Sequence, residues 1–274
     1  MTLPLRRCPW LLLTLAVIAC SLLVGVSAVR AAGYDPVGSF TAGLNEPVGV
    51  AVDNSSGPSG GDVYVASEVE ATGVSKFDAE GSSLSPPSPF DTEAFELETA
   101  ADGPARLSGA AVDPLNGDVY IVNARGEQIQ MFTPAGQEVD NSVFPISVAG
   151  SKVPVFLGKA DGLVVQIATD SAGDIYFPNP ANDAVQEFSP ATGDIINTFE
   201  GTSVGAFNKP AAVAVDSEGN VYVADTGAGR VVRIAGEAGQ PNPAGAQTVL
   251  AEGGARTVAI DPSNGDVFVG KYNE

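Results

Sequence analysis

The stretch DSEGNVYVADTGAGRVVRI at residues 216–234 contains the pattern that decides the fold. It begins with Asp216 and a Gly-Asn pair, continues into the run VYV at 221–223, and reaches a second run, VV at 231–232, after Gly-Ala-Gly. β-Branched and aromatic residues favour strands, whereas the glycines and Asn220 favour tight turns. The stretch therefore predicts a turn, a strand, a second turn and a second strand.

Four other stretches repeat this pattern. Each begins with an aspartate (Asp53, Asp113, Asp170 or Asp261), passes through a Gly-containing turn and continues into an apolar run. The strands after the five turns start at residues 63, 119, 175, 221 and 267, so the spacings are 56, 56, 46 and 46 residues. A period of roughly 40 to 50 residues with several short strands per copy is typical of propeller blades. We therefore expect an all-β protein, a β-propeller of four-stranded blades.

We place the propeller in residues 33–274. Its five recognisable repeats predict most of its strands. The expected strands are 48–52, 63–66, 74–78 and 95–98; 110–112, 119–122, 128–132 and one within 139–148; 163–168, 175–177, 184–188 and 195–199; 211–215, 221–224, 230–234 and 247–250; 257–260 and 267–269. The last blade is truncated: its third strand is missing, so it stays incomplete even with the strand-like run at 37–40 as its fourth strand. We interpret the chain as a fragment of a six-bladed ring, with a five-bladed closure as the alternative.

Residues 1–32 are predicted to direct export of the domain that follows them. Arg6 and Arg7 precede an uncharged apolar run from residue 8 to 29, and small residues follow at 26–28 and 29–31. These features are typical of a secretory signal peptide. Two alternatives stay open: an uncleaved anchor, because the run is long enough to span a bilayer, and lipidation at Cys20, because residues 17–20 resemble a bacterial lipobox. All three predict an exported domain that is secreted or associated with the cell surface.

Composition excludes several classes of function. Asp and Glu number 33 against 13 Lys and Arg, which gives a net charge of −20. Such a surface repels nucleic-acid phosphates and anionic lipids, so we expect no nucleic-acid partner and membrane contact only through the N-terminal segment. The chain has no histidine, and its two cysteines, Cys8 and Cys20, lie in the leader. The folded domain therefore lacks the usual general base, a disulfide and a cysteine nucleophile.

The fourth repeat resembles the NHL-repeat proteins. It carries FNKP at 207–210 and VAVDSEGNVYVADTGAGRVVRI at 213–234, and LNEP at 44–47 opens the first repeat in a similar way. Residues 123–125 followed by QIQMF, and Asn182 followed by AVQEFSPATG, match in part. The resemblance extends from about residue 37 to the C-terminus and implies a propeller, commonly six-bladed. It implies no particular function, because such propellers occur in enzymes, sensors and scaffolds.

The loops after the second strands hold the residues that we expect to bind a ligand. In a propeller these loops lie on one face, and here their charge varies between blades, as it does in ligand-contacting loops. The predicted ligand-binding residues are Asn123, Arg125, Asn179, Asp225 and Arg230. As a structural alternative, the two arginines pair locally with carboxylates such as Glu127 and Asp225.

The five turn aspartates are interpreted as structural residues, not as metal ligands. Each starts a turn that contains Gly, and Asp side chains in such turns accept a hydrogen bond from the backbone two residues on. No catalytic residue and no metal ligand is predicted.

These observations favour an exported, non-catalytic binding or scaffold propeller that presents its loops to a protein or glycan partner at the cell envelope. The alternative is a calcium-dependent propeller hydrolase or lactonase that acts in the central channel, since Asp, Asn and Glu oxygens suit calcium. Propeller lyases and lactonases of related architecture typically use histidine, which this chain lacks. Apart from calcium in that alternative, no cofactor is expected.

Overall fold

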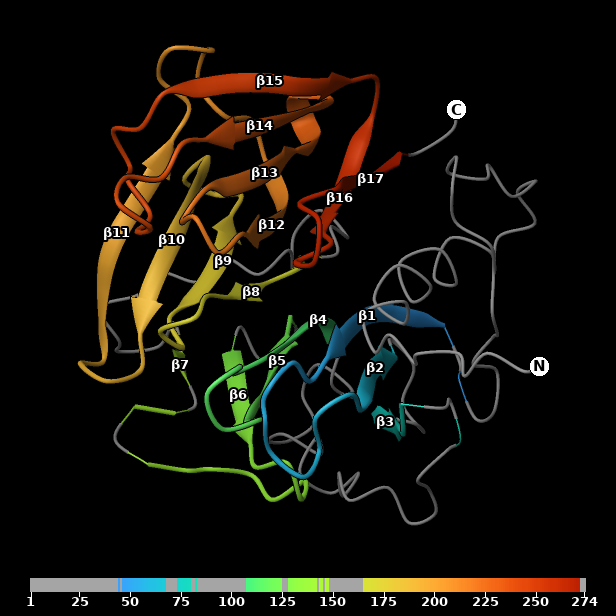
Figure 1. The fold of residues 1–274 in the computed structure, drawn as a ribbon. Coiled ribbons are helices and arrows are strands. Elements are labelled where there is room, and N and C mark those ends of the chain that lie inside the picture. Colours follow the sequence, from blue (N-terminus) through green and yellow to red (C-terminus); the bar gives the residue numbers. More distant parts are fainter. Residues whose placement is uncertain are drawn as a thin grey trace, which may run out of the picture.

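The computed structural model describes residues 44, 46–67, 73–79, 82, 107–124, 128–141, 143–144, 146–147 and 165–271. These residues form five small antiparallel sheets, one for each predicted repeat (Figure 1). Within these ranges the one helical element is η2, a single 3-10 turn at Thr226–Ala228. The search of these residues for a helix long and apolar enough to cross a membrane found none. The all-β prediction is confirmed.

Each sheet is one blade, and its strands follow one another in chain order. In blades two to four the sheet has four strands. Blade one has β1 (Pro47–Val52), β2 (Val63–Ser67) and β3 (Val74–Phe77); blade two has β4 (Leu107–Val112), β5 (Val119–Asn123), β6 (Gln128–Phe132) and β7 (Ile146–Ser147); blade three has β8 (Ala168–Thr169), β9 (Ile175–Asn179), β10 (Ala184–Ser189) and β11 (Asp194–Glu200). Blade four has β12 (Pro210–Val215), β13 (Val221–Asp225), β14 (Arg230–Ile234) and β15 (Gln247–Glu252), and blade five has β16 (Ala255–Ile260) and β17 (Val267–Lys271).

The first strand of blade three differs from its prediction. We expected a strand over 163–168, but β8 covers only Ala168–Thr169. The preceding backbone turns to the neighbouring blade instead: Gln166 forms a parallel bridge with Ala212, and its amide donates to the Ala211 carbonyl at 2.9 Å. The predicted runs at 37–40 and 95–98 lie outside the described residues.

The second strand of each inner blade (blades two, three and four) is packed between two neighbouring blades. In β5, Val119 and Ile121 join a cluster with Tyr64 of blade one, whereas Tyr120 and Val122 join a cluster with blade three. All five residues of β5 are consequently buried. The alternation follows from strand geometry, which sends successive side chains to opposite faces.

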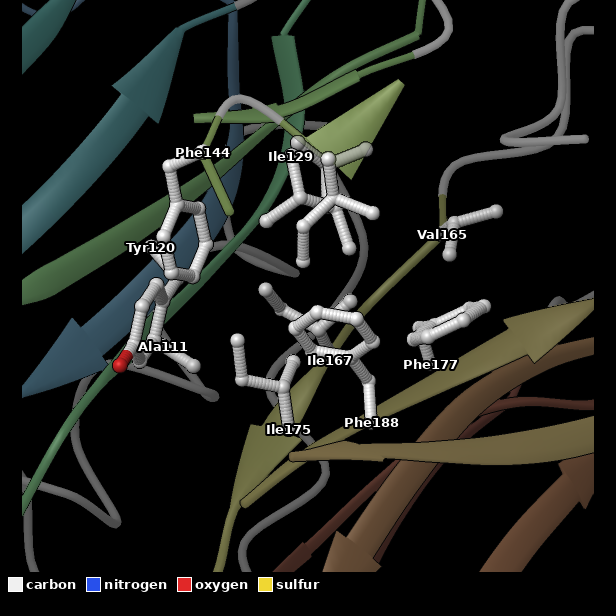
Figure 2. Close-up of a cluster of buried hydrophobic side chains, with 11 residues drawn as sticks. Ala111, Tyr120, Ile129, Phe144, Val165, Ile167, Ile175, Phe177 and Phe188 are labelled. Atoms are coloured by element: carbon white, nitrogen blue, oxygen red, sulfur yellow. The ribbon is translucent and has the colours of Figure 1, made fainter. Parts of the chain in front are cut away.

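Figure 2 shows the cluster between blades two and three. Tyr120 and Phe144 of blade two are stacked with ring centroids 5.5 Å apart, and Phe188 of blade three meets Phe144 edge-on at 6.4 Å. The other side chains of this cluster include Ile129 from blade two and Ile167 and Phe177 from blade three. Their burial holds the two blades face to face, because apolar area is removed from water on both sheets.

Glycine allows the first strands of neighbouring blades to approach closely. A Cβ added to Gly49 would lie 2.7 Å from the Ser108 carbonyl oxygen, and one added to Gly109 would lie 2.3 Å from that of Val165. Both distances are too short for a real side chain, so only Gly fits at these two contacts. The backbones of β1 and β4 are therefore in close contact, and so are those of β4 and of the segment that precedes β8.

We predict that the outer strand of blade five exchanges its amide hydrogens faster than the second strand of blade four. β17 pairs only with β16 among the described strands and is partly exposed, whereas β13 is buried and pairs with both β12 and β14. Protection from exchange follows burial and hydrogen bonding. Hydrogen–deuterium exchange by mass spectrometry should show earlier deuteration in peptides spanning 267–271 than in those spanning 221–225. Equal protection of the two strands would contradict this prediction.

Candidate functional site

Three predicted ligand-binding residues occupy equivalent positions at one end of the blades. Asn123, Asn179 and Asp225 are each the last residue of a second strand. Their exposed fractions are 1%, 0% and 0%, so they lie beneath the loops and not on the surface. Arg230 begins β14 directly opposite Asp225, and Arg125 lies outside the described residues. Direct ligand binding by these five residues stays a prediction.

Asn179 stabilises the loop that follows its own strand. Its Nδ2 donates to Oε1 of Gln186 at 2.9 Å, and its Oδ1 accepts a hydrogen bond from the Asn182 amide at 3.2 Å. A buried amide side chain with both ends bonded fixes the turn between β9 and β10, because leaving either end unbonded in the interior would be unfavourable.

Asp225 and Arg230 form a salt bridge inside the same end of blade four. Oδ2 of Asp225 lies 2.8 Å from Nε of Arg230, and Oδ1 accepts a hydrogen bond from the Asn208 amide at 2.6 Å. The local pairing that we considered as the structural alternative for Arg230 is thus confirmed. The pair is mostly buried, with side-chain exposures of 15% for Arg230 and 0% for Asp225, so it is screened by solvent less than a surface pair.

Arg230 also determines the conformation of the linking loop, which we define as residues 201–209 between blades three and four. Its guanidinium donates to the carbonyl of Val204, to that of Gly205 at 2.8 Å and to that of Ala206 at 3.0 Å. The planar guanidinium has several donors in a rigid arrangement. One side chain therefore holds three consecutive peptide groups in place.

Side chains from both blades fix the two ends of the linking loop. Near its start, Gln247 of β15 donates to the Glu200 carbonyl at 2.7 Å and accepts from the Thr202 amide at 2.9 Å. Near its end, the Lys209 amide donates to Oδ1 of Asp183 at 2.8 Å. Asp183 belongs to the loop between β9 and β10, so the linking loop is attached to blade three as well as to blade four.

Backbone strain is concentrated at the same end of the blades. Asp183 and Lys209 have φ values of 52° and 49°, and Glu46, which precedes Pro47 as Lys209 precedes Pro210, has 48°. Positive φ is unfavourable for residues other than glycine and persists only where the surroundings hold it. The hydrogen bond between Asp183 and Lys209 joins two of these strained residues, so the loop geometry is imposed by the fold.

The outer surface of the linking loop is polar. Thr202, Ser203, Asn208 and Lys209 are exposed, together with Gly205 and Ala206. Residues 201–209 contain no carboxylate, histidine or cysteine. The loop can therefore donate and accept hydrogen bonds with a partner, and its one ionisable side chain is that of Lys209.

The turn aspartates lie at the opposite end of the blades and are structural, as expected. In each of the five turns, Oδ1 of the aspartate accepts a hydrogen bond from the amide two residues on. The donors are Ser55 at 2.7 Å, Leu115 at 2.8 Å, Ala172 at 2.8 Å, Glu218 at 2.9 Å and Ser263 at 2.9 Å.

Sequence reasoning did not single out Asp183, Gln247 or Asn208, although all three shape the linking loop. One signal was present in the sequence: FNKP at 207–210 repeats LNEP at 44–47, and in both the residue before proline has positive φ. The contacts of Gln247 and Asp183 join segments 45 and 26 residues apart, and no local pattern indicates them.

We predict that Asp225→Ala lowers the free energy of unfolding by about 3 kcal/mol, because it leaves a mostly buried guanidinium without its carboxylate and the Asn208 amide without its acceptor. Urea denaturation measures the change. Lys271→Ala is the matched control, since Lys271 ends β17 at the same repeat position but is exposed, and it should change stability by less than about 0.5 kcal/mol. Equal effects of the two substitutions would contradict the prediction.

Comparison with known proteins indicates the type of fold. An NHL repeat model matches residues 207–234, and comparison with curated protein sequences gave no match. The chain is similar to the extracellular domain of a protein assigned as a hybrid two-component system of B. thetaiotaomicron, at 14% identity and a TM-score of 0.55 over 86% of this chain and 28% of that one.

Two further solved structures are similar. One is an auxiliary nutrient binding protein from Bacteroides ovatus, at 16% identity and a TM-score of 0.53 over 84% of this chain and 58% of that one. The other contains the RRP9 WD40 repeats, at 14% identity and a TM-score of 0.51 over 81% of this chain and 56% of that one. At such identities the likeness shows the fold alone. The chain therefore carries an NHL repeat, as its sequence indicated, within a fold of the β-propeller type.

Proposed function

We propose that the chain is an exported, non-catalytic β-propeller that binds a protein or glycan partner at the cell envelope through the loop face that carries the linking loop. The observation that carries this proposal is the number of side chains that fix residues 201–209. Arg230, Asp225 and Gln247 hold the loop from blade four, and Asp183 holds it from blade three. The free protein thus already has a defined loop surface.

A surface that is ordered before binding favours affinity. Association otherwise costs about 0.5 to 1.5 kcal/mol for each mobile side chain that becomes fixed, in addition to the cost of ordering a loop. The linking loop has no regular secondary structure, yet its conformation is held by side-chain hydrogen bonds from the mostly buried pair of Asp225 and Arg230, from the half-buried Gln247 and from the exposed Asp183. The backbone is therefore arranged to present Thr202, Ser203 and Asn208 without further ordering.

The chemistry of the loop suits a polar partner. Hydroxyl and amide side chains next to exposed backbone form hydrogen bonds with the hydroxyl groups of a glycan or with the edge of a protein loop. The net charge of −20 disfavours a strongly anionic partner. Absence of histidine from the chain favours binding over acid–base catalysis.

Two other observations support parts of the proposal. The apolar leader with Arg6 and Arg7 at its start supports export. The fold likeness to an auxiliary nutrient binding protein and to an extracellular domain supports a binding role outside the cell by analogy. Such analogy shows that propellers of this kind are used for binding, and the partner of this chain has to be found by experiment.

We predict that Ser203→Arg abolishes partner binding. The full chain is applied at about 10 μM, a concentration that detects weak specific complexes, to a glycan array and to immobilised cell-envelope proteins. The wild-type chain should bind at least one of the immobilised glycans or proteins. Ser203→Arg should not bind that glycan or protein, because the bulky cationic side chain covers the linking loop. Ser217→Arg is the matched control, since Ser217 is an exposed serine in the turn at the other end of β12, and it should bind as the wild type does.

Two results would contradict this function. The first is that the wild-type chain binds none of the immobilised glycans or proteins at that concentration, or that both arginine variants bind equally well. The second is calcium-dependent hydrolysis of a lactone or ester probe by the wild type, which would instead support the hydrolase alternative.

A further inference from the structure

Carboxyl groups from two blades meet at the seam between blades two and three, away from the linking loop. We call this group the acidic seam; it consists of Asp113 and Asp118 from the turn between β4 and β5, Asp170 and Asp174 from the turn between β8 and β9, and Glu187 from β10. The carboxylate oxygens of Asp170, Asp174 and Glu187 lie within 4.8 Å of one another. Asp113 faces them across the seam, because a Cβ added to Gly173 would lie 3.1 Å from its Oδ2.

The acidic seam is largely enclosed, and its hydrogen-bond donors are neutral. Glu187 is 3% exposed and Asp113 is 6% exposed. Glu187 accepts a hydrogen bond from Nδ2 of Asn197 at 2.7 Å, and the Tyr176 hydroxyl donates to Asp170 at 3.0 Å and also bonds Glu187. Neutral donors stabilise a buried carboxylate less than a cation does.

Comparison of the repeats shows that blade three lacks the cation that blades one and four place beside the tyrosine of the second strand. In blades one to four, a tyrosine of the second strand lies opposite one residue of the third strand; these pairs are Tyr64 with Lys76, Tyr120 with Met131, Tyr176 with Glu187, and Tyr222 with Arg233. Blades one and four thus place a cation next to their tyrosine, and Lys76 forms a salt bridge of 2.8 Å with Asp62. Blade three has a carboxylate at this position.

Burial and like charge both act on these carboxyl groups. Burial raises the pKa of Glu187, the hydrogen bonds that it shares with Tyr176 and Asn197 lower it, and the charges of Asp170 and Asp174 raise it. Burial likewise raises the pKa of Asp174 and of Asp113. Burial and the charge of Asp113 raise the pKa of Asp118. The other titratable groups that face the seam are Tyr120 on β5 and Tyr176 on β9, whose pKa values burial also raises.

We propose that the seam between blades two and three is a proton-dependent joint, which takes up a proton at its carboxyl groups when the domain folds and becomes less stable when that proton is lost. Two carboxyl groups that share one proton form a favourable hydrogen bond, whereas two ionised groups in the same enclosed space repel each other. Among the described residues, no lysine or arginine contributes to the raised pKa values of Asp113, Asp118, Asp174 and Glu187.

The direction in which pH changes the stability of the folded domain follows from the difference in proton binding between the folded and unfolded states. Because the folded seam holds its protons to higher pH than the unfolded chain, the folded state binds more protons over the range between the two sets of pKa values. The contribution of the seam is then most favourable near or below the ordinary carboxyl pKa of about 4. It decreases as pH rises toward the raised pKa values of the folded state, and it stays low above them.

Replacement of Glu187 tests the joint. Glu187→Gln keeps the size of the side chain and its acceptor for Asn197 but removes the ionisable group. Melting temperatures of the full chain are measured from about pH 5 to about pH 8 in buffers that contain a chelator. We predict that the variant melts about 2 to 4 °C above the wild type near pH 8, and that this difference disappears toward pH 5. Glu187→Arg, which copies Arg233, should also melt above the wild type near pH 8.

Glu200→Gln is the matched control, because Glu200 is an exposed carboxylate on the neighbouring strand β11, and it should follow the wild type at every pH. If Glu187→Gln is less stable by the same amount at all pH values, Glu187 is a structural residue only and the proposal is wrong. The same conclusion follows if the pH-dependent difference is absent with the chelator and present only when calcium is added. Should Glu187→Gln not fold, Asp174→Asn is measured in its place. If Asp174→Asn is less stable than the wild type by the same amount at all pH values, the proposal is wrong.

Discussion

The structure depends on one packing constraint: the second strand of each inner blade must be covered on both of its faces. A sheet of three or four short strands leaves both faces open to water unless another element packs on them, and here every residue of β5, β9 and β13 is buried. Val119 and Ile121 contact the blade before, and Tyr120 and Val122 contact the blade after. Since the same alternation recurs between blades three and four and between blades four and five, one blade cannot be stable without its neighbours.

Close stacking of the blades also explains the candidate site. The chain must travel from the outer strand of one blade to the first strand of the next, and residues 201–209 do so across the end of blade four. Asp225 and Arg230 lie below this crossing and bond its backbone. Asp225, at the end of the second strand of blade four, is thus part of the support of the linking loop, and the loop carries the exposed groups. The acidic seam at the other end of blades two and three has the same origin, because the turns of adjacent blades are pressed together there.

Much of this fold could be predicted from the sequence, for a physical reason. Second strands and turn aspartates are local features, so the repeated Asp, Gly and apolar run indicate them without knowledge of tertiary contacts. β6 and β14 lie where the pattern predicted them. The first strand of blade three did not follow its pattern, because Gln166 pairs with the neighbouring blade. For the candidate site, the sequence places Asn179 and Asp225 at the ends of second strands, and their role as ligand contacts stays a prediction. Their burial was not predicted, because it follows from packing beneath the loops; the Asn208 amide that bonds Asp225 lies 17 residues away in the chain.

The proposed binding surface requires that the linking loop is ordered before any partner binds. Amide hydrogen exchange of the free chain, resolved to single residues by NMR, measures this order. We expect slow exchange for the amides of Asn208 and Lys209, which donate to Asp225 and Asp183, compared with the amide of the exposed Gly239. If Asn208 and Lys209 exchange as fast as Gly239, the loop is mobile in the free protein and does not present a surface that is ordered in advance.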